Sequence, residues 1–320
     1  MLILAPMQGL TEVLFRKTYE TCYPGAFDYA VSPFVSLTHG NLHDAEKKIH
    51  DVLPEVNQDS MVVVPQILGH EKEEFVDLAN RFYELGYSEV NWNMGCPMRR
   101  VAHKHRGSGI LPYPEEVRDI LTHVMTRIRP KLSVKVRLGY YSPDEIDHII
   151  PVLNDFPLKD ITIHPRIGKQ QYSGRPDLEK LAQIVPEIRH RIIYNGDICT
   201  TYDYKKIMQL FPSIKDVMIG RGVLYNPTLP LQIRNQFSAD FGGEGTPDPS
   251  SHCTSAAEFV IQLMNNILQM NVSDQAKGRK MKEYWCLASR SLPGTEERKR
   301  RVLHASALDE IFNRILEIAK

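Results

Sequence analysis

Polar and charged side chains follow short apolar runs at regular intervals along the 320-residue chain, and they include the residues whose types could do chemistry. Lys135 and His164 lie within or at the end of two such runs, and Gln66 and Asn93 at the end of two others. A single polar residue in such a place is ordinary in a solvated loop. Polar groups at nearly every place of this kind indicate a binding site assembled from several segments.

Two features of this set indicate a phosphorylated ligand with a planar ring. The segments 195–197 (Asn-Gly-Asp) and 220–222 (Gly-Arg-Gly) combine glycines, which allow close backbone approach, with Arg221, which can bind phosphate oxygens. Amide side chains together with a lysine suit a ring edged with carbonyl groups, such as isoalloxazine. No GxGxxG follows an apolar run, so a tightly held dinucleotide is not indicated. The pattern therefore predicts flavin mononucleotide (FMN).

Cys96 is the cysteine with a distinctive setting, between Gly95 and Pro97 just past an apolar run. An inert buried thiol is the commonest role of a free cysteine and is the alternative to a reactive one. The other four cysteines are predicted to be structural. The loop 99–106 contains four Arg or Lys residues and no acid, and a cationic loop beside a reactive thiol suggests a polyanionic substrate.

A second basic segment covers residues 277–301, with nine Arg or Lys residues and three acids. Tyr284 and Trp285 lie among these charges and could stack on nucleic-acid bases. A solvated helix face is the alternative. Two basic segments in a chain of zero net charge favour an RNA or DNA substrate.

Eight apolar runs must position these side chains, and their centres lie about 30 residues apart. Most of the gaps have the apolar spacing of a helix. Eight successive βα units predict a (β/α)8 TIM barrel, whose active site lies at the carboxyl ends of the strands; an open doubly wound sheet is the alternative. The predicted strands cover residues 2–5, 29–32, 61–67, 89–93, 132–137, 160–164, 191–195 and 216–220.

Two further segments follow the predicted barrel domain, which covers residues 1–240. Residues 241–251 are rich in Gly, Pro, Ser and Asp and are predicted to form a linker. Residues 252–320 show helical apolar spacing and are predicted to form a small all-helical domain.

Composition excludes several classes of protein. Hydrophobic residues make up 42% and charged residues 24%, as in ordinary globular chains. Five cysteines without CxxC spacing argue against a disulfide scaffold or a metal site and favour a reduced, cytoplasmic setting. No run reaches 18 apolar residues, so no membrane span is expected. The apolar N-terminus lacks a basic region and is predicted to be a strand and not a signal peptide.

The sequence resembles the tRNA-dihydrouridine synthases in several motifs that follow the family's order. Between residues 4 and about 227 these are APMQGLTE, NWNMGCP with VAHKHRGSG, SVKVRLG, TIHPR, YNGDI and VMIGRGVLYNP. A basic helical C-terminal region follows, as expected of the family. Three details depart from the family pattern: Ile110 after the GSG segment, Pro165 after His164, and Asp197 where Glu is also common. The short N-terminus and the C-terminal pattern favour the subfamily that acts on U16.

The resemblance implies a tightly bound FMN, with NADPH or NADH as the transient reductant. Reduced FMN would pass a hydride from N5 to C6 of a D-loop uridine in tRNA, and Cys96 would be the general acid that protonates C5. The implied cofactor-binding residues are Pro6, Met7, Gln8, Gln66, Lys135, His164, Asn195, Gly196, Asp197, Gly220 and Arg221. The implied substrate-binding or tRNA-binding residues are Asn93, Arg99, Lys104, Arg166, Tyr172, Lys280 and Lys282. No metal and no stable protein partner are implied, and a monomer is expected.

Three other functions remain open at this point. A flavin-dependent reductase of a small pyrimidine or enone would share the barrel and FMN but would not need the basic C-terminal region. A Schiff-base lyase would use Lys135 as its nucleophile and need no flavin. A non-catalytic RNA-binding protein would keep the barrel as a scaffold and would not depend on Cys96.

Overall fold

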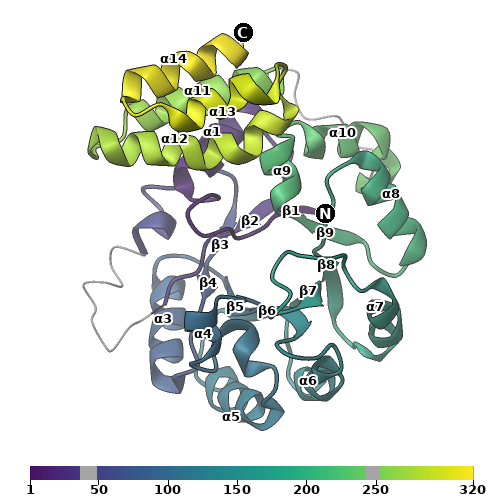
Figure 1. Ribbon diagram of the computed structural model, residues 1–320. Helices are drawn as coiled ribbons and strands as arrows, with labels where there is room; N and C mark the ends of the chain where they lie inside the picture. The colour runs from purple at the N-terminus through teal and green to yellow at the C-terminus, as the bar shows by residue number, and fades with distance from the viewer. Residues whose placement is uncertain (37–48, 243–252, 320) are drawn as a thin grey trace.

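A closed parallel barrel forms the first part of the molecule, and a group of helices follows it (Figure 1). The structure is a computed structural model and describes residues 1–36, 49–242 and 253–319. Within these residues the sheet has nine strands in the order β3-β2-β1-β9-β8-β7-β6-β5-β4, with every pair parallel. The strands are β1 (Leu2–Leu4), β2 (Tyr29–Val31), β3 (Val63–Val64), β4 (Gln66–Ile67), β5 (Glu89–Met94), β6 (Lys131–Gly139), β7 (Asp160–Ile167), β8 (Arg191–Tyr194) and β9 (Asp216–Ile219).

Pro65 divides one barrel strand into β3 and β4. A proline has no N–H to donate to a sheet ladder, although its carbonyl still accepts a hydrogen bond from the backbone N–H of Asn91 at 2.9 Å. β3 pairs with β2, and β4 pairs with β5, so the two ends of the strand order are halves of one strand and the circle closes. The eight predicted strands and the TIM barrel are confirmed, and the open sheet is wrong.

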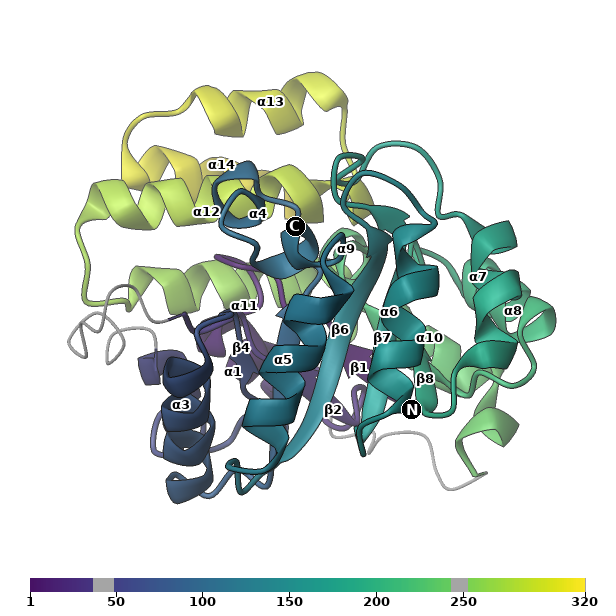
Figure 2. The same ribbon diagram turned by 90° about the horizontal axis from the view of Figure 1, so that it is seen from below.

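Helices cover the outside of the barrel (Figures 1 and 2), and the sequence marks where several begin. Pro114 occupies the first turn of its helix, where its missing N–H costs nothing. Thr200 and Asp203 form a reciprocal capping box at the start of another. The five predicted helices are confirmed as α3 (Lys72–Glu84), α5 (Pro114–Met125), α6 (Glu145–Asn154), α7 (Leu178–Ile184) and α8 (Thr201–Leu210). Sequence patterns did not predict α1 (Val13–Cys22), α4 (Arg99–Ala102), α9 (Arg221–Tyr225) or α10 (Leu229–Gln236).

Alternation along the strands divides the barrel interior into an apolar and a polar half. Side chains such as Val90, Trp92 and Val134 join the large outer core beneath the helices. The inner apolar group comes from β1, β2, β3, β8 and β9 and consists of Ile3, Ala5, Tyr29, Val31, Val64, Ile193 and Met218. The alternate positions of β4 to β7 carry buried polar residues, namely Gln66, Glu89, Asn91, Asn93, Ser133, Asp160, Thr162 and His164. Polar interior residues therefore concentrate on one side of the barrel.

Four helices make up the C-terminal region and pack against the first helix of the barrel (Figure 1). They are α11 (Ala256–Leu268), α12 (Asp274–Ala288), α13 (Glu296–His304) and α14 (Leu308–Ala319). Aromatic rings form much of the junction, since Phe15 and Tyr19 of α1 and Tyr23, which follows it, contact Phe259 of α11 at centroid distances of 5.5–5.8 Å. The helical C-terminal region is confirmed. Most of the predicted linker, residues 243–251, lies outside the described residues.

Two expectations about cysteines and aromatic residues are wrong. A disulfide joins Cys22 of α1 to Cys253, whereas the sequence favoured reduced thiols throughout. Tyr284 and Trp285 cannot stack on bases as placed, because both are buried: the Tyr284 hydroxyl donates to the Leu10 carbonyl at 2.5 Å, and the Trp285 indole N–H donates to the Lys299 carbonyl at 2.9 Å. No helix among the described residues is long and apolar enough to span a membrane.

Candidate active site

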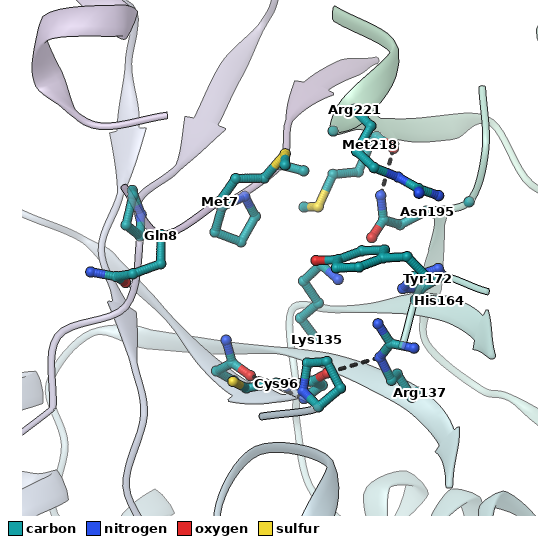
Figure 3. A pocket seen from close by; sticks show the side chains of 18 of the residues that line it. Met7, Gln8, Cys96, Lys135, Arg137, His164, Tyr172, Asn195, Met218 and Arg221 are labelled. Atoms are coloured by element: carbon teal, nitrogen blue, oxygen red, sulfur yellow. Dashed lines mark hydrogen bonds between the residues drawn. The ribbon is translucent and has the colours of Figure 1, made fainter. Parts of the chain in front are cut away.

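A cavity of about 480 Å³ opens where the barrel strands end (Figure 3). Segments that follow β1, β2, β5, β7, β8 and β9 contribute to its wall, and β6 contributes Lys135 and Arg137 from within the strand, as expected at the carboxyl ends of TIM-barrel strands. Thirteen of the residues predicted from the sequence line it: Pro6, Met7, Gln8, Asn93, Cys96, Lys135, His164, Tyr172, Asn195, Gly196, Asp197, Gly220 and Arg221.

Cys96 is buried at the cavity wall, and its backbone is held on both sides. Its N–H donates to Asn93 Oδ1 at 2.8 Å, and its carbonyl accepts from the Ser108 N–H at 3.0 Å and the Ser108 hydroxyl at 2.9 Å. Gly107 allows this approach, because a Cβ there would lie 2.7 Å from Cys96 Cβ, and the residue has a φ of +57°. Burial raises the pKa of the thiol, with Arg137, Arg100 and Lys135 acting in the opposite sense, so the thiol is protonated at neutral pH.

Lys135 of β6 and His164 of β7 both line the cavity (Figure 3). Burial, reinforced by the neighbouring Arg137, lowers the pKa of Lys135 to about 7. Burial and the surrounding cations also place the pKa of His164 well below its ordinary value, so its imidazole is neutral. Arg166 Nη1 lies 3.1 Å from His164 Nε2, and since arginine only donates, the His164 proton belongs on Nδ1.

Asp197 is the carboxylate among these cations, and two arginines hold it. Arg166 contacts both of its oxygens at 3.0 and 2.5 Å, and Arg221 Nη2 contacts Oδ1 at 2.6 Å. These bonds lower the pKa of the Asp197 carboxyl against the effect of burial. Its φ of +36° is uncommon for a residue with a side chain, so the arginine pair also fixes a strained turn.

Tyr172 lies over the cavity between two guanidinium groups (Figure 3). Its ring centroid is 4.6 Å from Arg221 Cζ and 5.6 Å from Arg137 Cζ, and 49% of the residue is exposed. Arg137 itself is buried and donates to the carbonyls of Gly95, Ile167 and Gln171 at 2.7–3.1 Å. It therefore ties the segment containing Cys96 to the segment that presents Tyr172.

Six predicted residues do not line the cavity: Gln66, Arg99, Lys104, Arg166, Lys280 and Lys282. Gln66 is fully buried, and its amide bonds Asn91 and Asn93, which places it behind the cavity wall. Arg166 is also buried, and besides His164 and Asp197 it bonds the carbonyls of Ser173 and Gly174. A direct tRNA contact by Arg166 is therefore wrong for this structure, because its donors already serve protein acceptors.

Lys280 points into the protein and holds the loop after β1. Its ammonium donates to the Gly9 carbonyl and pairs with Glu12 at 2.8 Å. The Tyr284 hydroxyl holds the next carbonyl, that of Leu10. Because Met7 and Gln8 precede these contacts, α12 of the C-terminal region supports a loop that lines the cavity. Lys280 as a free phosphate contact is wrong, whereas Arg99 and Lys104 are exposed and Lys282 is partly exposed.

Sequence patterns missed several residues of the cavity wall. Pro33 and Phe34 follow β2 and have no side chain of the polar kind that marked the other strand ends, and Cys199 follows the 195–197 turn. Arg100 lines the cavity, although only its neighbours Arg99 and Lys104 were singled out. Successive residues of a helix face different directions, so a helix predicted at α4 could have distinguished Arg100 from Arg99. No group of three or more potential metal ligands occurs in the ranges that the structure describes.

The family model for dihydrouridine synthase matches residues 3–319, nearly the whole chain. The chain belongs to the dihydrouridine synthase family. Its curated relatives include a "Probable tRNA-dihydrouridine synthase" of Staphylococcus epidermidis, which is 25% identical over 96% of this chain and 90% of the relative. A "tRNA-dihydrouridine synthase B" of Pasteurella multocida is 27% identical over 71% of this chain and 67% of the relative.

Solved structures with a similar fold include two old yellow enzymes. The old yellow enzyme homologue of Zymomonas mobilis has a TM-score of 0.53 at 11% identity and covers 74% of this chain and 88% of its own. The old yellow enzyme of Trypanosoma cruzi has a TM-score of 0.51 at 8% identity, covering 81% and 93%. At these identities the likeness establishes the TIM-barrel fold alone, while family membership makes this synthase an oxidoreductase.

Proposed function

We propose that this protein is an FMN-dependent tRNA-dihydrouridine synthase that uses NADPH or NADH to reduce the C5–C6 double bond of a D-loop uridine. The observation that carries the proposal is the position of Cys96, a protonated thiol at the wall of a cavity that also presents Lys135, His164 and Arg221. Family membership supplies the reaction class, and these residues supply the groups that the reaction needs.

The cavity fits FMN in size and charge. Its volume of about 480 Å³ lies within the range of roughly 300–1,000 Å³ found for cofactor sites. Arg221 and the backbone of residues 195–197 and 220–222 would hold the phosphate, and Gly220 keeps this part open, since a Cβ there would already touch Met7 Sδ at 3.4 Å. Lys135 and His164 would face the ring. When bound, FMN supplies hydride transfer to the uracil ring.

Lys135 stabilises negative charge on the ligand at its side of the cavity. Its pKa of about 7 reflects burial, with Arg137 acting in the same sense and Cys96 in the opposite sense. An anionic group bound beside it favours the ammonium form and raises that pKa. Arg137 keeps the Lys135 neighbourhood positive while its own donors stay on backbone carbonyls.

Cys96 acts as the general acid. Reduction at C6 of the uracil leaves charge at C5 and O4, and a proton must reach C5. The raised pKa of the Cys96 thiol keeps the proton in place until the base is present. Asn93 and Ser108 fix the backbone of this residue, so the thiol is held at one place on the cavity wall.

A uridine within tRNA must leave its stack to reach a cavity inside a barrel mouth, as in other enzymes that modify bases. Tyr172, half-exposed above the cavity, would contact the extruded base. The exposed cations Arg99, Arg100 and Lys104 would bind the phosphate backbone, together with Lys282 on α12. We further propose that the enzyme works as a cytoplasmic monomer and acts at U16.

Mass spectrometry of the nucleosides of unmodified tRNA tests the proposal, after incubation with the protein and NADPH. Dihydrouridine at one D-loop position, with FMN released on denaturation, is the expected result, and fragment mapping gives the position. Dihydrouridine formation from free uridine but not from tRNA would favour the small-molecule reductase. A protein that binds tRNA but cannot be loaded with FMN would contradict the proposal.

A further inference from the structure

Five buried side chains on the polar side of the barrel form one continuous hydrogen-bonded array. They are Gln66 of β4, Glu89, Asn91 and Asn93 of β5, and Ser133 of β6, with exposed fractions between 0% and 9%. We call this set the amide array. It begins with Glu89 at the amino end of its strand and reaches Asn93 at the cavity, so it runs through the barrel interior.

Each bond of the amide array has a donor and an acceptor side. The Ser133 hydroxyl donates to Glu89 Oε1 at 3.0 Å, and Asn91 Nδ2 donates to the Ser133 oxygen at 2.9 Å. Gln66 Nε2 donates to Asn91 Oδ1 at 2.8 Å. Asn93 Nδ2 donates to Gln66 Oε1 at 2.7 Å. Every donor therefore lies one step nearer the cavity than its acceptor.

The carboxylate of Glu89 fixes this direction at the far end of the array, as the backbone N–H groups of Gly95 and Cys96 fix it at the cavity end. An amide can present either its N–H or its oxygen to a neighbour, whereas an ionised carboxylate only accepts. Lys159 pairs with the other oxygen of Glu89. The Ser133 hydroxyl donates to Glu89 Oε1 at 3.0 Å, while its other acceptor, the Val90 carbonyl, lies farther away at 3.4 Å. The Ser133 oxygen accepts from Asn91, and each following amide then has one orientation that makes its bond.

Asn93, the last amide of the array, contacts the segment that contains Cys96. With its Nδ2 committed to Gln66, Asn93 turns its oxygen toward the backbone N–H groups of Gly95 and Cys96, at 3.0 and 2.8 Å. The reversed amide would bring an NH2 group against two N–H donors, and both bonds would be lost. The segment that carries the thiol would then keep only the bonds from Ser108 and Arg137 to its carbonyls and would be held less firmly.

We propose that Glu89 is a positioning residue for Cys96, acting through Ser133, Asn91, Gln66 and Asn93, although it lies at the far end of the barrel interior. The positioning of the thiol follows from the amide array alone. Its effect on the reaction rests on the proposed function of Cys96 as the acid. Two separate readouts distinguish these two parts.

The test replaces Ser133 by alanine, which interrupts the array and leaves the Glu89–Lys159 pair in place. Thr162→Val is the matched control, because Thr162 is a buried interior hydroxyl on the neighbouring strand, and no hydrogen-bond partner of its hydroxyl is found among the described residues. Ser133→Thr keeps the hydroxyl and should restore the array. All variants are compared as FMN-loaded protein with equal flavin content.

The first readout is the rate of Cys96 alkylation by iodoacetamide, followed by peptide mass spectrometry so that Cys199 and Cys286 are counted separately. The second is dihydrouridine formation in tRNA at saturating tRNA. For Ser133→Ala we expect alkylation to rise at least threefold and product formation to fall about tenfold, since small displacements of a reacting group cost about this much or more. Ser133→Thr and Thr162→Val should stay within about twofold of the unchanged protein.

Unchanged alkylation and unchanged product formation in Ser133→Ala would overturn the positioning role, as would slower product formation with unchanged alkylation. Altered alkylation with unchanged product formation would uphold the positioning and remove Cys96 as the acid. If Ser133→Ala is insoluble, Glu89→Gln serves instead, because its amide no longer enforces a direction, and the same pair of changes is expected.

Discussion

The two ends of the barrel bury charges of opposite sign. At the mouth, Lys135, Arg137 and Arg221 surround the cavity with one carboxylate, Asp197, between arginines. At the opposite end, which we call the floor, the amino ends of β5, β7 and β9 bring together Glu89, Asp160 and Asp216. Burial among cations lowers the pKa of Lys135 to about 7, whereas burial among carboxylates raises the pKa of Asp160 to about 6.

The two ends differ in how their charges are satisfied. On the floor, Asp216 pairs with the N-terminal ammonium and Arg191, and Glu89 pairs with Lys159. At the mouth, positive charge exceeds what Asp197 can neutralise. Charges that pair with each other stabilise the fold, whereas an excess of one sign around a cavity favours binding of a ligand of the opposite sign. Changes at the mouth should therefore alter function, and most changes on the floor should alter stability.

Cys96→Ala should give the largest functional effect at the mouth. Loss of the acid is expected to reduce dihydrouridine formation at least ~100-fold, in line with the usual contribution of general acid catalysis. FMN content, tRNA affinity and melting temperature should stay close to those of the unchanged protein. Cys286→Ala removes an exposed thiol elsewhere and is the control. Equal yields from the two variants would remove Cys96 from the mechanism.

Lys135 should make FMN affinity depend on pH. The ammonium is favoured when an anionic ligand lies beside it, so FMN binding takes up a proton between the free pKa of about 7 and the higher bound value. For one pKa unit of coupling, affinity is therefore expected to fall about fivefold as pH rises from 7 to 9. Fluorescence titration measures this change. Lys135→Met should weaken binding at pH 7 and abolish the slope; a persisting slope would assign it to another group.

Asp160→Asn should show the converse behaviour on the floor. The folded-state pKa of about 6 lies above the ordinary 3.8, so the charged carboxylate opposes folding above pH 6, and this penalty disappears as pH falls toward 4. The substitution should raise the free energy of unfolding by about 1–2 kcal/mol at pH 8 and by less at pH 4. Urea unfolding at both pH values measures the difference. A lower stability at pH 8 would mean that the carboxylate contributes a favourable interaction that outweighs its burial.

Substitutions of Lys280 and Lys282, two lysines on α12, should give the smallest effects. Lys282→Ala should lower the slope of log tRNA affinity against log salt by about one phosphate contact and leave FMN binding unchanged. Lys280→Ala removes the contacts with Gly9 and Glu12 and should weaken FMN binding about two- to fivefold through the loop before them. Filter binding and flavin titration separate the two effects. Identical behaviour of both variants would contradict the different roles assigned to these lysines.

The barrel could be predicted from the sequence because its strands and helices repeat at a regular spacing, and this spacing is visible without any knowledge of which residues are in contact. The sequence also predicted twelve residues of the cavity wall, since residues near or just past the carboxyl ends of parallel strands meet at one end of the barrel, and the family resemblance added Tyr172. The sequence did not show in which direction each side chain points. Gln66 and Arg166 have suitable chemistry at suitable positions, but their donors bond neighbouring strands and loops. From the sequence, Lys280 and Tyr284 belong to a basic segment that was expected on the surface. In the structure both point inward, because they contact the loop after β1. The contact between Cys22 and Cys253, 231 residues apart, left no local pattern.

We propose that the excess positive charge at the mouth holds a flavin whose electrons go to a uridine of tRNA. Anaerobic absorbance spectroscopy of the FMN-loaded protein tests this claim most directly. NADPH should bleach the flavin bands, and unmodified tRNA added under nitrogen should restore them, whereas free uridine should not. Reduced flavin that remains bleached with unmodified tRNA but recovers with a free pyrimidine would contradict the account.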